Sequence, residues 1–371
     1  MNIKITKRFD PWILISTLVM VSIGVIMSYS ASAIIAMERY GDHLYFLKRQ
    51  IAWVGIGSVL MVSVMLVDYE QLKKATLPLF AASVFMLVLI LFPVFSKEVG
   101  GARRWLVLGP FIFQPSELVK VSLILYMAHT LSRKADKIED FTVGYLPNLI
   151  VLGALAMLIA IQPDLGTAIV ITVVVSMLLF VAGVRMKHTF LTLLCSLPVL
   201  AYAVMFVPYR KRRILAFLNP WDDPTDSGFQ IIQSLLAIAR GGVTGLGLGN
   251  SKQKLFYLPE PHTDFIFSVI GEELGFIGVA FVLLCFIVFL WRGLRVAMKV
   301  DDLYGRYLAV GFSLLISVQA LINIGVVVGA LPTKGLPLPF ISVGGSSLIV
   351  SMVSAGILLN VSNKMYVKKQ P

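Results

Sequence analysis

One stretch of the chain decides its fold: residues 265–291, FIFSVIGEELGFIGVAFVLLCFIVFLW. From Phe276 to Trp291 this stretch contains no charged residue. A helix of about 20 mostly apolar residues is long enough to cross the hydrocarbon core of a bilayer. The stretch therefore predicts a membrane-spanning helix that carries two acids, Glu272 and Glu273, in its first half.

Comparable apolar runs recur along the whole chain. Of its 371 residues, 58% are hydrophobic and only 14% are charged, whereas a soluble domain carries about 25% charged residues. One soluble domain could not bury this much apolar surface. We therefore predict an all-α polytopic membrane protein with ten transmembrane helices, at residues 12–34, 51–67, 76–95, 115–132, 147–163, 166–183, 189–207, 265–291, 307–330 and 341–361.

Cysteine content and charge exclude two other classes of protein. The two cysteines, Cys195 and Cys285, both lie in apolar runs, which excludes a secreted scaffold held by disulfides. The net charge of +12 does not indicate a nucleic-acid partner, because the basic residues separate hydrophobic runs instead of forming one patch.

The distribution of basic residues orients the chain in the membrane. Ten crossings place both termini on one side, where the connections carry 17 Lys and Arg, against 8 in the short connections on the other side. Since basic connections stay in the cytoplasm, we expect cytoplasmic N- and C-termini and one long outer loop, residues 208–264, between helices 7 and 8. No internal repeat is visible, so we expect a single membrane domain over residues 1–371.

The first apolar run allows a second interpretation. A basic start at residues 4–8, an apolar core and the small residues 31–33 are also typical of a cleavable signal peptide. We favour a membrane span, because the apolar stretch is long enough to cross and continues to Ala36.

Polar motifs collect in the outer connections, whereas the inner connections are short and lack motifs. The outer groups are Gly100–Trp105, Gln114–Glu117 with Lys120, Gln162–Gly166, Tyr209–Arg213, Gly241–Gly249, Leu258–Asp264 and Leu331–Phe340. Any reaction is therefore expected at the outer membrane face. The glycine-rich run 241–249 lacks the lysine-serine/threonine ending of a Walker loop, so it favours a flexible re-entrant loop over a nucleotide site.

Asp264 is the strongest candidate for chemistry. It ends a proline-rich segment and begins the eighth span, at the outer water boundary and after the longest basic loop. A carboxylate there can act as a general base, but an acid at the start of a helix is also a routine cap, and both interpretations stay open. His262 is a competing base, and Thr263 is a further polar candidate between the two.

Other acids lie at or inside the predicted spans, where a charge is costly and usually paired. Glu117 and Lys120 are three residues apart on one helix face, so they can form an ion pair with either a structural or a direct catalytic role. Asp164 can cap the helix that follows it or pair with an arginine. For Glu272 and Glu273 we expect a structural or partner-helix role.

An enzyme on the outer face has neither ATP nor nucleotide sugars, so its substrate must carry its own activation. A sugar linked to an isoprenoid pyrophosphate does so, and its lipid tail suits a site in the membrane. Transfer from such a donor needs one base for the acceptor hydroxyl and cations for the leaving pyrophosphate. The candidates for those cations are Arg103, Arg104, Arg210, Arg213 and Lys334.

No metal site is assigned from the sequence. His43, His129 and His188 have no second ligand at metal spacing. A divalent cation, Mg²⁺ or Mn²⁺, could still assist the pyrophosphate. The acids able to supply oxygen ligands for it are Asp164, Asp222, Asp223 and Glu260.

The order of these motifs resembles the SEDS family (shape, elongation, division and sporulation), which comprises FtsW, RodA and SpoVE. The longest similar stretch is Tyr257–Phe267, followed by Glu272–Gly275. The others, in the same order along nearly the whole chain, are Gly101–Trp105, Phe113–Leu118, Gln162–Thr167 and Leu336–Ser342 with Gly344–Ser347.

The resemblance implies a ten-helix peptidoglycan glycosyltransferase of the bacterial cytoplasmic membrane that polymerises lipid II. It places the family's proposed catalytic aspartate on Asp264 and its functionally important Glu and Lys on Glu117 and Lys120. Residues 334–340 resemble the FtsW and SpoVE branch more than RodA, although Val343 departs from the tyrosine expected there.

The resemblance also implies partners. A class B penicillin-binding protein, which is a transpeptidase with a single membrane helix, is expected against helices 8 and 9, beside other division or elongation membrane proteins. Gly271, Gly275 and Gly278 could permit close approach of that helix, or tight packing within the bundle itself.

Two other functions compete with the polymerase. A lipid II flippase should carry polar residues through the membrane midplane and at both mouths, whereas here they concentrate on the outer side. A non-catalytic scaffold for division or elongation proteins would use Asp264 only as a helix cap, and asparagine would then serve nearly as well.

Overall fold

Long helices cover all ten apolar runs in the computed structural model, which describes residues 8–99, 102–108, 111–225, 228–254, 258 and 261–366. These helices are α1 (Pro11–Tyr40), α2 (Tyr45–Leu66), α3 (Tyr69–Leu89), α4 (Pro115–Arg133), α5 (Leu146–Ile161), α6 (Leu165–Val181), α7 (Met186–Met205), α10 (Ile266–Lys299), α11 (Leu303–Val327) and α12 (Gly345–Asn363). The predicted helices 8 and 9 are therefore α10 and α11.

Within the described residues, seven helical segments are long and apolar enough to cross a membrane. They are α1, α2, α3, α5 with the turn before it, α10, α11 and α12. Helix α6 is apolar but has 17 residues, and α4 carries Glu117 and Lys120 in its first two turns. Ten crossings thus remain a prediction.

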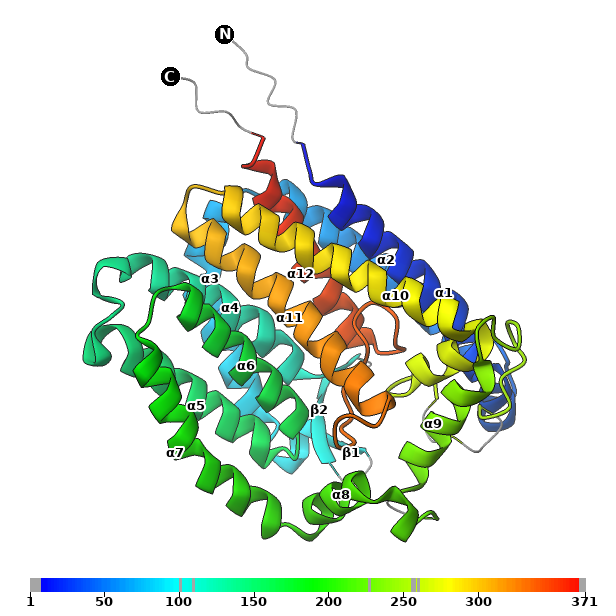
Figure 1. The fold of residues 1–371 in the computed structure, drawn as a ribbon. Helices are drawn as coiled ribbons and strands as arrows, with labels where there is room; N and C mark the ends of the chain where they lie inside the picture. The colour runs from blue at the N-terminus through cyan, green and yellow to red at the C-terminus, as the bar shows by residue number, and fades with distance from the viewer. Residues whose placement is uncertain are drawn as a thin grey trace.

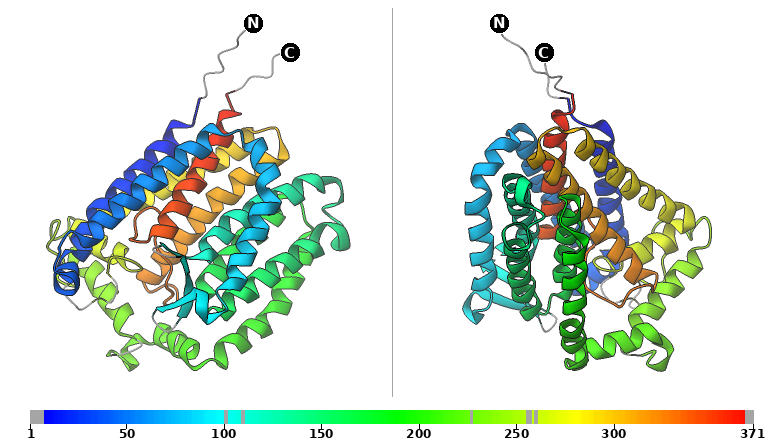
Figure 2. Two further views of the ribbon diagram at one scale, coloured as in Figure 1. Left: turned by 180° about the vertical axis from the view of Figure 1, so that it is seen from behind. Right: turned by 60° about the vertical axis from the view of Figure 1, so that its left-hand side comes forward.

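Helices α11 and α12 form the centre of the bundle. They are the most buried of the candidate spans, with 67% and 78% of their most apolar windows inside the protein. Helices α1, α2 and α10 pack on one side of this centre, and α3, α4, α5 and α6 on the other (Figure 1). Helix α7 lies at the edge of the bundle (Figure 2). The centre therefore offers the most rigid elements for positioning a site.

The start of α1 and the end of α12 meet at one end of the bundle (Figure 1). The backbone N–H of Asp10 donates to Ser362 Oγ over 3.0 Å. The buried Asp10 carboxylate caps α1 and forms an ion pair with Arg292 of α10. The start of α1 and the end of α12 thus lie on the same side of the bundle, as an even number of crossings would require.

The opposite end is built from the connections that carry the sequence motifs (Figures 1 and 2). The 208–264 connection, expected only as a loop, contains α8 (Pro208–Leu218) and α9 (Phe229–Gly241). A three-stranded antiparallel sheet, β1 (Ser96–Val99), β2 (Ala102–Leu108) and β3 (Phe111–Phe113), was not expected. Single turns of other helix types lie at Pro93–Phe95, Ala135–Lys137, Phe141–Tyr145 and Pro220–Asp222.

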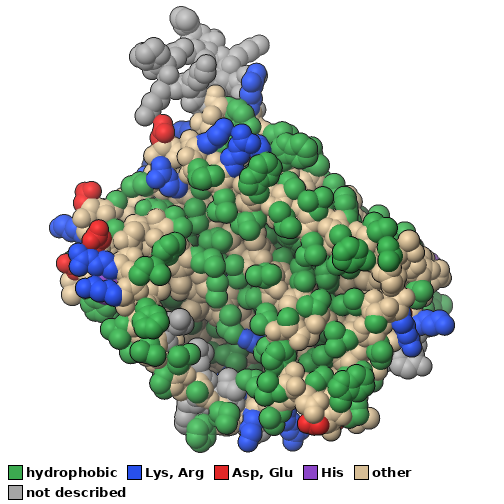
Figure 3. Space-filling model, in the orientation of Figure 1, with side chains coloured by type: hydrophobic (Ala, Val, Ile, Leu, Met, Phe, Trp, Pro, Cys, Tyr) green, Lys and Arg blue, Asp and Glu red, His purple; other side chains and the backbone are tan. Residues whose placement is uncertain are grey.

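The surface separates apolar from charged side chains. Figure 3 shows hydrophobic side chains over the middle of one face, with most charged groups toward its edges. Large apolar side chains of α10 are exposed on the protein surface, among them Phe276, Ile287 and Trp291. An apolar middle between charged ends is the surface that a bilayer covers.

Candidate active site at the outer end of the bundle

Asp264 lies in a short segment that runs beside the connection between α11 and α12. Three consecutive backbone carbonyls of this segment accept hydrogen bonds. The His262 carbonyl accepts from Val343 N over 3.0 Å, and the Thr263 carbonyl accepts from Ser342 Oγ over 2.6 Å. The Asp264 carbonyl accepts from Asn323 Nδ2 over 2.8 Å. The backbone of the segment is thereby held independently of the Asp264 carboxyl group.

The Asp264 carboxylate faces Gly335. A Cβ atom placed on Gly335 would lie 3.0 Å from Asp264 Oδ2, so a glycine is what lets the connection come this close. Asp264 itself is half-buried. Helix α10 begins at Ile266 with Phe265 as its N-cap, so Asp264 lies one residue before the cap position. Asp264 therefore lies outside the N-cap position of α10, and its role as a general base stays a prediction.

Two predicted cationic residues reach the same connection. Lys334 precedes Gly335 and is half-buried, and Arg213 of α8 donates from Nη1 to the Thr333 carbonyl over 2.9 Å. Burial lowers the pKa of Lys334, and the positive charge of Arg213 lowers it further. Two cations that raise each other's electrostatic energy would gain from an anionic ligand between them.

Glu117 and Lys120 form an ion pair behind this connection. Lys120 Nζ lies 2.8 Å from Glu117 Oε1, and both side chains are at most 2% exposed. Lys120 also donates to Gln319 Oε1 of α11 over 2.7 Å. Gln319 Nε2 in turn donates to the Pro337 carbonyl over 2.9 Å. The pair is thus linked to the connection through one side chain.

Asp164 is the N-cap of α6 and holds a second network. Its Oδ1 accepts from Thr167 N over 3.2 Å. Its Oδ2 accepts from Gln114 Nε2 and Ser116 Oγ, each over 3.3 Å. Gln114 N donates to Ser346 Oγ at the start of α12. Asp164 therefore caps α6 and joins it to the start of α4, as the capping interpretation predicts.

The other predicted cations lie elsewhere. Arg103 of β2 pairs with Glu98 at an exposed position, over 3.2 Å. Arg104 donates to the backbone carbonyls of Gln162 and Pro163, and Arg210 donates to the Ala160 carbonyl over 3.2 Å. All three lie around the outer end of α5, where Arg103 lines a pocket together with Ile161 and Pro163. The contacts described for these three arginines are at the end of α5 and not at Asp264. The reason is that β2 and the start of α8 both lie against this end of α5.

His262 and Thr263 have separate surroundings although they precede Asp264 directly. The His262 side chain is buried, and its ring centroid lies 4.5 Å from that of Phe46. Thr263 is half-buried. A buried, aromatic-packed imidazole is less accessible to an acceptor hydroxyl than the half-buried carboxylate that follows it.

The glycine-rich run folds back onto α10 at a break in that helix. Gly275 has a φ of 63° inside α10. There the N–H groups of Leu246 and Gly247 donate to the carbonyls of Glu272 and Glu273, each over 3.0 Å. The N–H groups of residues 276 and 277 donate back to the carbonyls of residues 242 and 243. Broken-helix backbone is tolerated in a membrane where such partners satisfy it.

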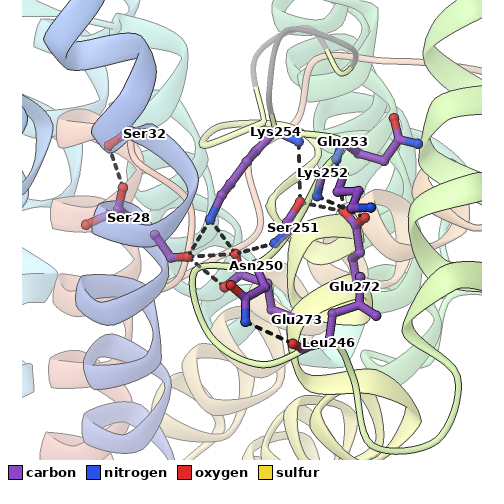
Figure 4. Close-up of polar contacts among 11 residues, drawn as sticks. Ser28, Ser32, Leu246, Asn250, Ser251, Lys252, Gln253, Lys254, Glu272 and Glu273 are labelled. Atoms are coloured by element: carbon purple, nitrogen blue, oxygen red, sulfur yellow. Dashed lines mark hydrogen bonds and ion pairs between the residues drawn. The ribbon is translucent and has the colours of Figure 1, made fainter.

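The side chains of Glu272 and Glu273 hold the rest of this loop (Figure 4). Glu272 accepts from Ser251 Oγ and from the backbone N–H groups of Lys252 and Gln253. Glu273 accepts from Lys254 Nζ over 2.7 Å and from Ser30 of α1. Both carboxylates are fully buried, so they have the structural role expected for them.

Two of the three glycines considered for a partner helix, Gly271 and Gly275, contact this chain's own loop, whereas a Cβ on Gly278 would lie 2.2 Å from Leu274 Cβ of α10 itself. A Cβ on Gly271 would lie 3.2 Å from Ile238 of α9, and one on Gly275 would lie 2.3 Å from Gly245 N. A Cβ on Gly241 would lie 1.9 Å from the Gly271 carbonyl oxygen. These close approaches therefore dock α9 and the glycine-rich run on α10.

Three site residues, Gln319, Asn323 and Ser342, were assigned no role from the sequence, although Ser342 ends one of the stretches similar to the family. The first two are buried amides one helical turn apart in an apolar helix. Intramembrane polar residues at that spacing are a signal that could have been used. Ser342 offered no such signal, because its role depends on the path of the connection.

The described residues include no group of three or more His, Cys, Asp or Glu placed to hold a metal ion. Of the acids considered as oxygen ligands, Asp164 accepts the hydrogen bonds given above and Asp222 accepts from Asn219 Nδ2 over 2.6 Å. Glu260 lies outside the described residues. Assistance by Mg²⁺ or Mn²⁺ therefore stays a prediction without a site.

The whole chain is similar to proteins of known family. A family model for FtsW, RodA and SpoVE, described as "Cell cycle protein", matches residues 11–367. The "Probable peptidoglycan glycosyltransferase FtsW" of Geobacter sulfurreducens is 47% identical over 98% of each chain. "Stage V sporulation protein E" of Bacillus subtilis is 46% identical over 96% of this chain and 98% of that protein.

Two solved structures share the fold. A chain of the structure described as "Structural coordination of polymerization and crosslinking by a peptidoglycan synthase complex" has a TM-score of 0.78 and 31% identity, covering 97% of this chain and 99% of that one. The crystal structure of Thermus thermophilus "Rod shape determining protein RodA" has a TM-score of 0.68 and 28% identity, covering 97% and 98%.

These relatives confirm the family resemblance. They also agree with the FtsW and SpoVE branch, since the FtsW and SpoVE proteins are 46–47% identical to this chain and the chain of the RodA structure is 28% identical to it. With seven apolar helices among its described residues that are long enough to span a bilayer, and with these relatives, the chain is a multi-pass protein of the cytoplasmic membrane. It belongs to the FtsW, RodA and SpoVE family of cell cycle proteins.

Proposed function

We propose that this protein is a peptidoglycan glycosyltransferase that polymerises lipid II at the outer face of the cytoplasmic membrane. The Geobacter sulfurreducens relative, named a probable peptidoglycan glycosyltransferase, supports this class of activity. One observation carries the proposal for the site: Asp264, Lys334 and Arg213 converge on residues 333–335. One carboxylate and two cations are the groups that transfer from a pyrophosphate-linked sugar requires.

The proposed reaction uses Asp264 as the general base. The carboxylate takes the proton from the acceptor sugar hydroxyl while that oxygen forms the new bond to the anomeric carbon of the donor sugar. The bond from this carbon to the pyrophosphate oxygen breaks, and undecaprenyl pyrophosphate leaves. Arg213 and Lys334 are proposed to bind the charge that grows on the leaving oxygens.

The proposed topology has ten crossings within one membrane domain, with both termini in the cytoplasm. Support comes from the meeting of Asp10 and Ser362 at one end of the bundle and of the motif-bearing connections at the other. The connections predicted on the same side as the termini carry the excess of Lys and Arg, which is typical of the cytoplasmic side. This arrangement puts Asp264 on the outer side, where lipid II is consumed.

The proposed partner is a class B penicillin-binding protein whose membrane helix packs against α10 and α11. The structural relative described as a peptidoglycan synthase complex supports an assembly of this kind. On α10, Phe276, Ile277 and Phe281 are at least half exposed and could receive an apolar helix. Other division or elongation membrane proteins are expected to join this complex.

The test is a gel of glycan products from purified protein and lipid II, with and without the cognate transpeptidase. Wild type should form polymer, and Asp264→Asn should form none while it unfolds at the same temperature as wild type. Asp42→Asn is the control, because Asp42 is another outer acid, and it pairs with Lys48 at the surface and accepts from the Leu44 N–H. Normal polymer from folded Asp264→Asn protein would remove Asp264 as the base.

A further inference from the structure

Two buried amides of α11 face the connection that carries Lys334 and Gly335. Gln319 and Asn323 are each 2% exposed and lie one helical turn apart on a central helix of the bundle. Neither belongs to a motif that the function has used. Buried polar side chains in an apolar helix are costly unless their hydrogen bonds are used.

Asn323 joins the two segments that form the site. Its Nδ2 donates to the Asp264 carbonyl over 2.8 Å and to the Leu336 carbonyl over 2.7 Å. Both N–H groups of one rigid amide are therefore used, one on each segment. The distance between Asp264 and residues 334–336 is thus set by a single side chain that contacts backbone on both sides.

Gln319 makes the equivalent contact one turn away. Its Nε2 donates to the Pro337 carbonyl, and its Oε1 accepts from Lys120 over 2.7 Å. Lys120 is in turn bound to Glu117. The buried ion pair therefore reaches the connection through the carbonyl next to the one that Asn323 holds.

We propose that Asn323 is a positioning residue that sets the Asp264 carboxylate against Lys334, and that Gln319 transmits the restraint of the Glu117–Lys120 pair to the same connection. This inference rests on the proposed function. Neither amide touches the carboxylate of Asp264, so each acts through the backbone. Displacing a reacting group by about 1 Å can lower the reaction rate about 100-fold. Loss of these restraints should therefore lower the activity measurably.

The hydroxyl of Ser342 and the N–H of Val343 complete the clamp from the other side. They hold the carbonyls of Thr263 and His262, the two residues before Asp264. Ser342 Oγ also accepts from Leu338 N over 2.8 Å, so the connection is folded against itself at this point. Asn323 differs from these two groups because its side chain spans Asp264 and the residue after Gly335.

The test compares Asn323→Leu with Asn360→Leu. Asn360 of α12 is also buried and also donates its side-chain amide to backbone carbonyls, those of residues 64, 65 and 67, at the opposite end of the bundle. The readouts are kcat and KM for lipid II polymerisation, and hydrogen exchange of peptides covering residues 262–268 and 331–344. Both proteins are the full chain in detergent.

We expect Asn323→Leu to lower kcat by about 10- to 100-fold with KM changed less than threefold, and to speed exchange in both peptides. Asn360→Leu should leave kcat and the exchange of both peptides unchanged. Unchanged exchange in Asn323→Leu would overturn the inference, as would faster exchange with wild-type kcat. If wild type itself makes no polymer, the proposed function fails, while exchange still decides whether Asn323 holds the two segments.

Asn323→Asp guards against a folding defect in the leucine variant, because it keeps the shape of the side chain. The ionised carboxyl cannot donate to the two carbonyls, whereas the protonated one can donate to one of them. The activity of this variant relative to wild type should therefore rise as the pH falls. A ratio that is flat with pH would contradict a role through hydrogen-bond donation.

A double-mutant cycle tests the part assigned to Gln319. The amides of Gln319 and Asn323 bind adjacent carbonyls of one connection. The effects of Gln319→Leu and Asn323→Leu on kcat should therefore be less than multiplicative when the two substitutions are combined. Multiplicative effects would show that Gln319 acts independently of the clamp and would overturn its assigned part.

Discussion

The ammonium of Lys254 lies 2.7 Å from Glu273 Oε1, in an ion pair whose two side chains are 5% and 0% exposed. This contact joins residue 254 of the long outer loop to α10 just before the break at Gly275. Ser30 of α1 donates to the same carboxylate over 2.7 Å. The loop that precedes Asp264 is thereby bound to two helices instead of being free in solvent.

The first prediction concerns this pair. Lys254→Met should lower the free energy of unfolding by about 3–5 kcal/mol, because it leaves the buried Glu273 carboxylate without its cation. Thermal unfolding in detergent measures the effect. The control is Lys252→Met in the same loop, since the Lys252 side chain is exposed and only its backbone N–H binds Glu272. Equal melting temperatures for the two variants would show that the pair does not hold the loop.

The second prediction concerns the Glu117–Lys120 pair. Glu117→Ala should cost about 3–5 kcal/mol of stability, because Lys120 then stays buried with its charge uncompensated. Replacing both residues by apolar side chains should cost less, since no charge remains to be buried. The comparison is made by thermal unfolding of the single and double variants, and a double variant that is no more stable than the single one would argue against pairing.

The third prediction is a pH dependence set by Lys334. Its lowered pKa means that the ammonium loses its proton at a lower pH than an ordinary lysine does. If that charge binds pyrophosphate, activity should fall early on the alkaline side, and Lys334→Arg should extend activity to higher pH because a guanidinium stays charged.

Stability should change in the opposite direction over the same pH window. Above the lowered pKa the unfolded chain binds the Lys334 proton more tightly than the folded protein, so the folded state gains stability as the pH rises. The measurements are kcat/KM and melting temperature for wild type and Lys334→Arg across neutral to alkaline pH. If kcat/KM falls over the same alkaline pH range in both proteins, Lys334 is not the group whose titration limits activity.

The fourth prediction concerns the contact between Gly335 and Asp264. Gly335→Ala places a Cβ 3.0 Å from Asp264 Oδ2, so the carboxylate must shift by a few tenths of an ångström. We expect kcat to fall by about 10-fold, with little change in melting temperature. Gly55→Ala on α2 is the control, because a Cβ there meets nothing within 4 Å. Equal kcat in both variants would show that the carboxylate tolerates displacement.

Much of the fold could be predicted from the sequence because a bilayer requires long apolar helices. The helices over residues 266–299 and 303–327 extend the predicted runs at their inner ends, from residue 291 to 299 and from residue 307 back to 303. The sheet at residues 96–113 was missed, since short strands on a membrane surface lack an extended alternating pattern. Helix α9 was missed because its residues were taken together with the polar loop around them.

The candidate site was predictable in part. Asp264 and the basic residues could be named as candidates, since their side chains alone determine what chemistry they can perform. Their grouping could not: Arg213 and Lys334 lie by the connection beside Asp264, whereas Arg103, Arg104 and Arg210 surround the end of α5. Which cations share a site depends on how the outer connections cross, and their sequence carries no periodic signal for that.

Hydropathy and charge, read along the chain, were enough to establish a helical membrane protein and to point to its outer side, because both depend on local composition. Only the tertiary structure brought Asn323, some sixty positions further along, against the Asp264 carbonyl, and Gln319 against Lys120. Such contacts arise from the packing of helices distant in the chain, and a single amide can satisfy two carbonyls only after that packing has placed them within its reach.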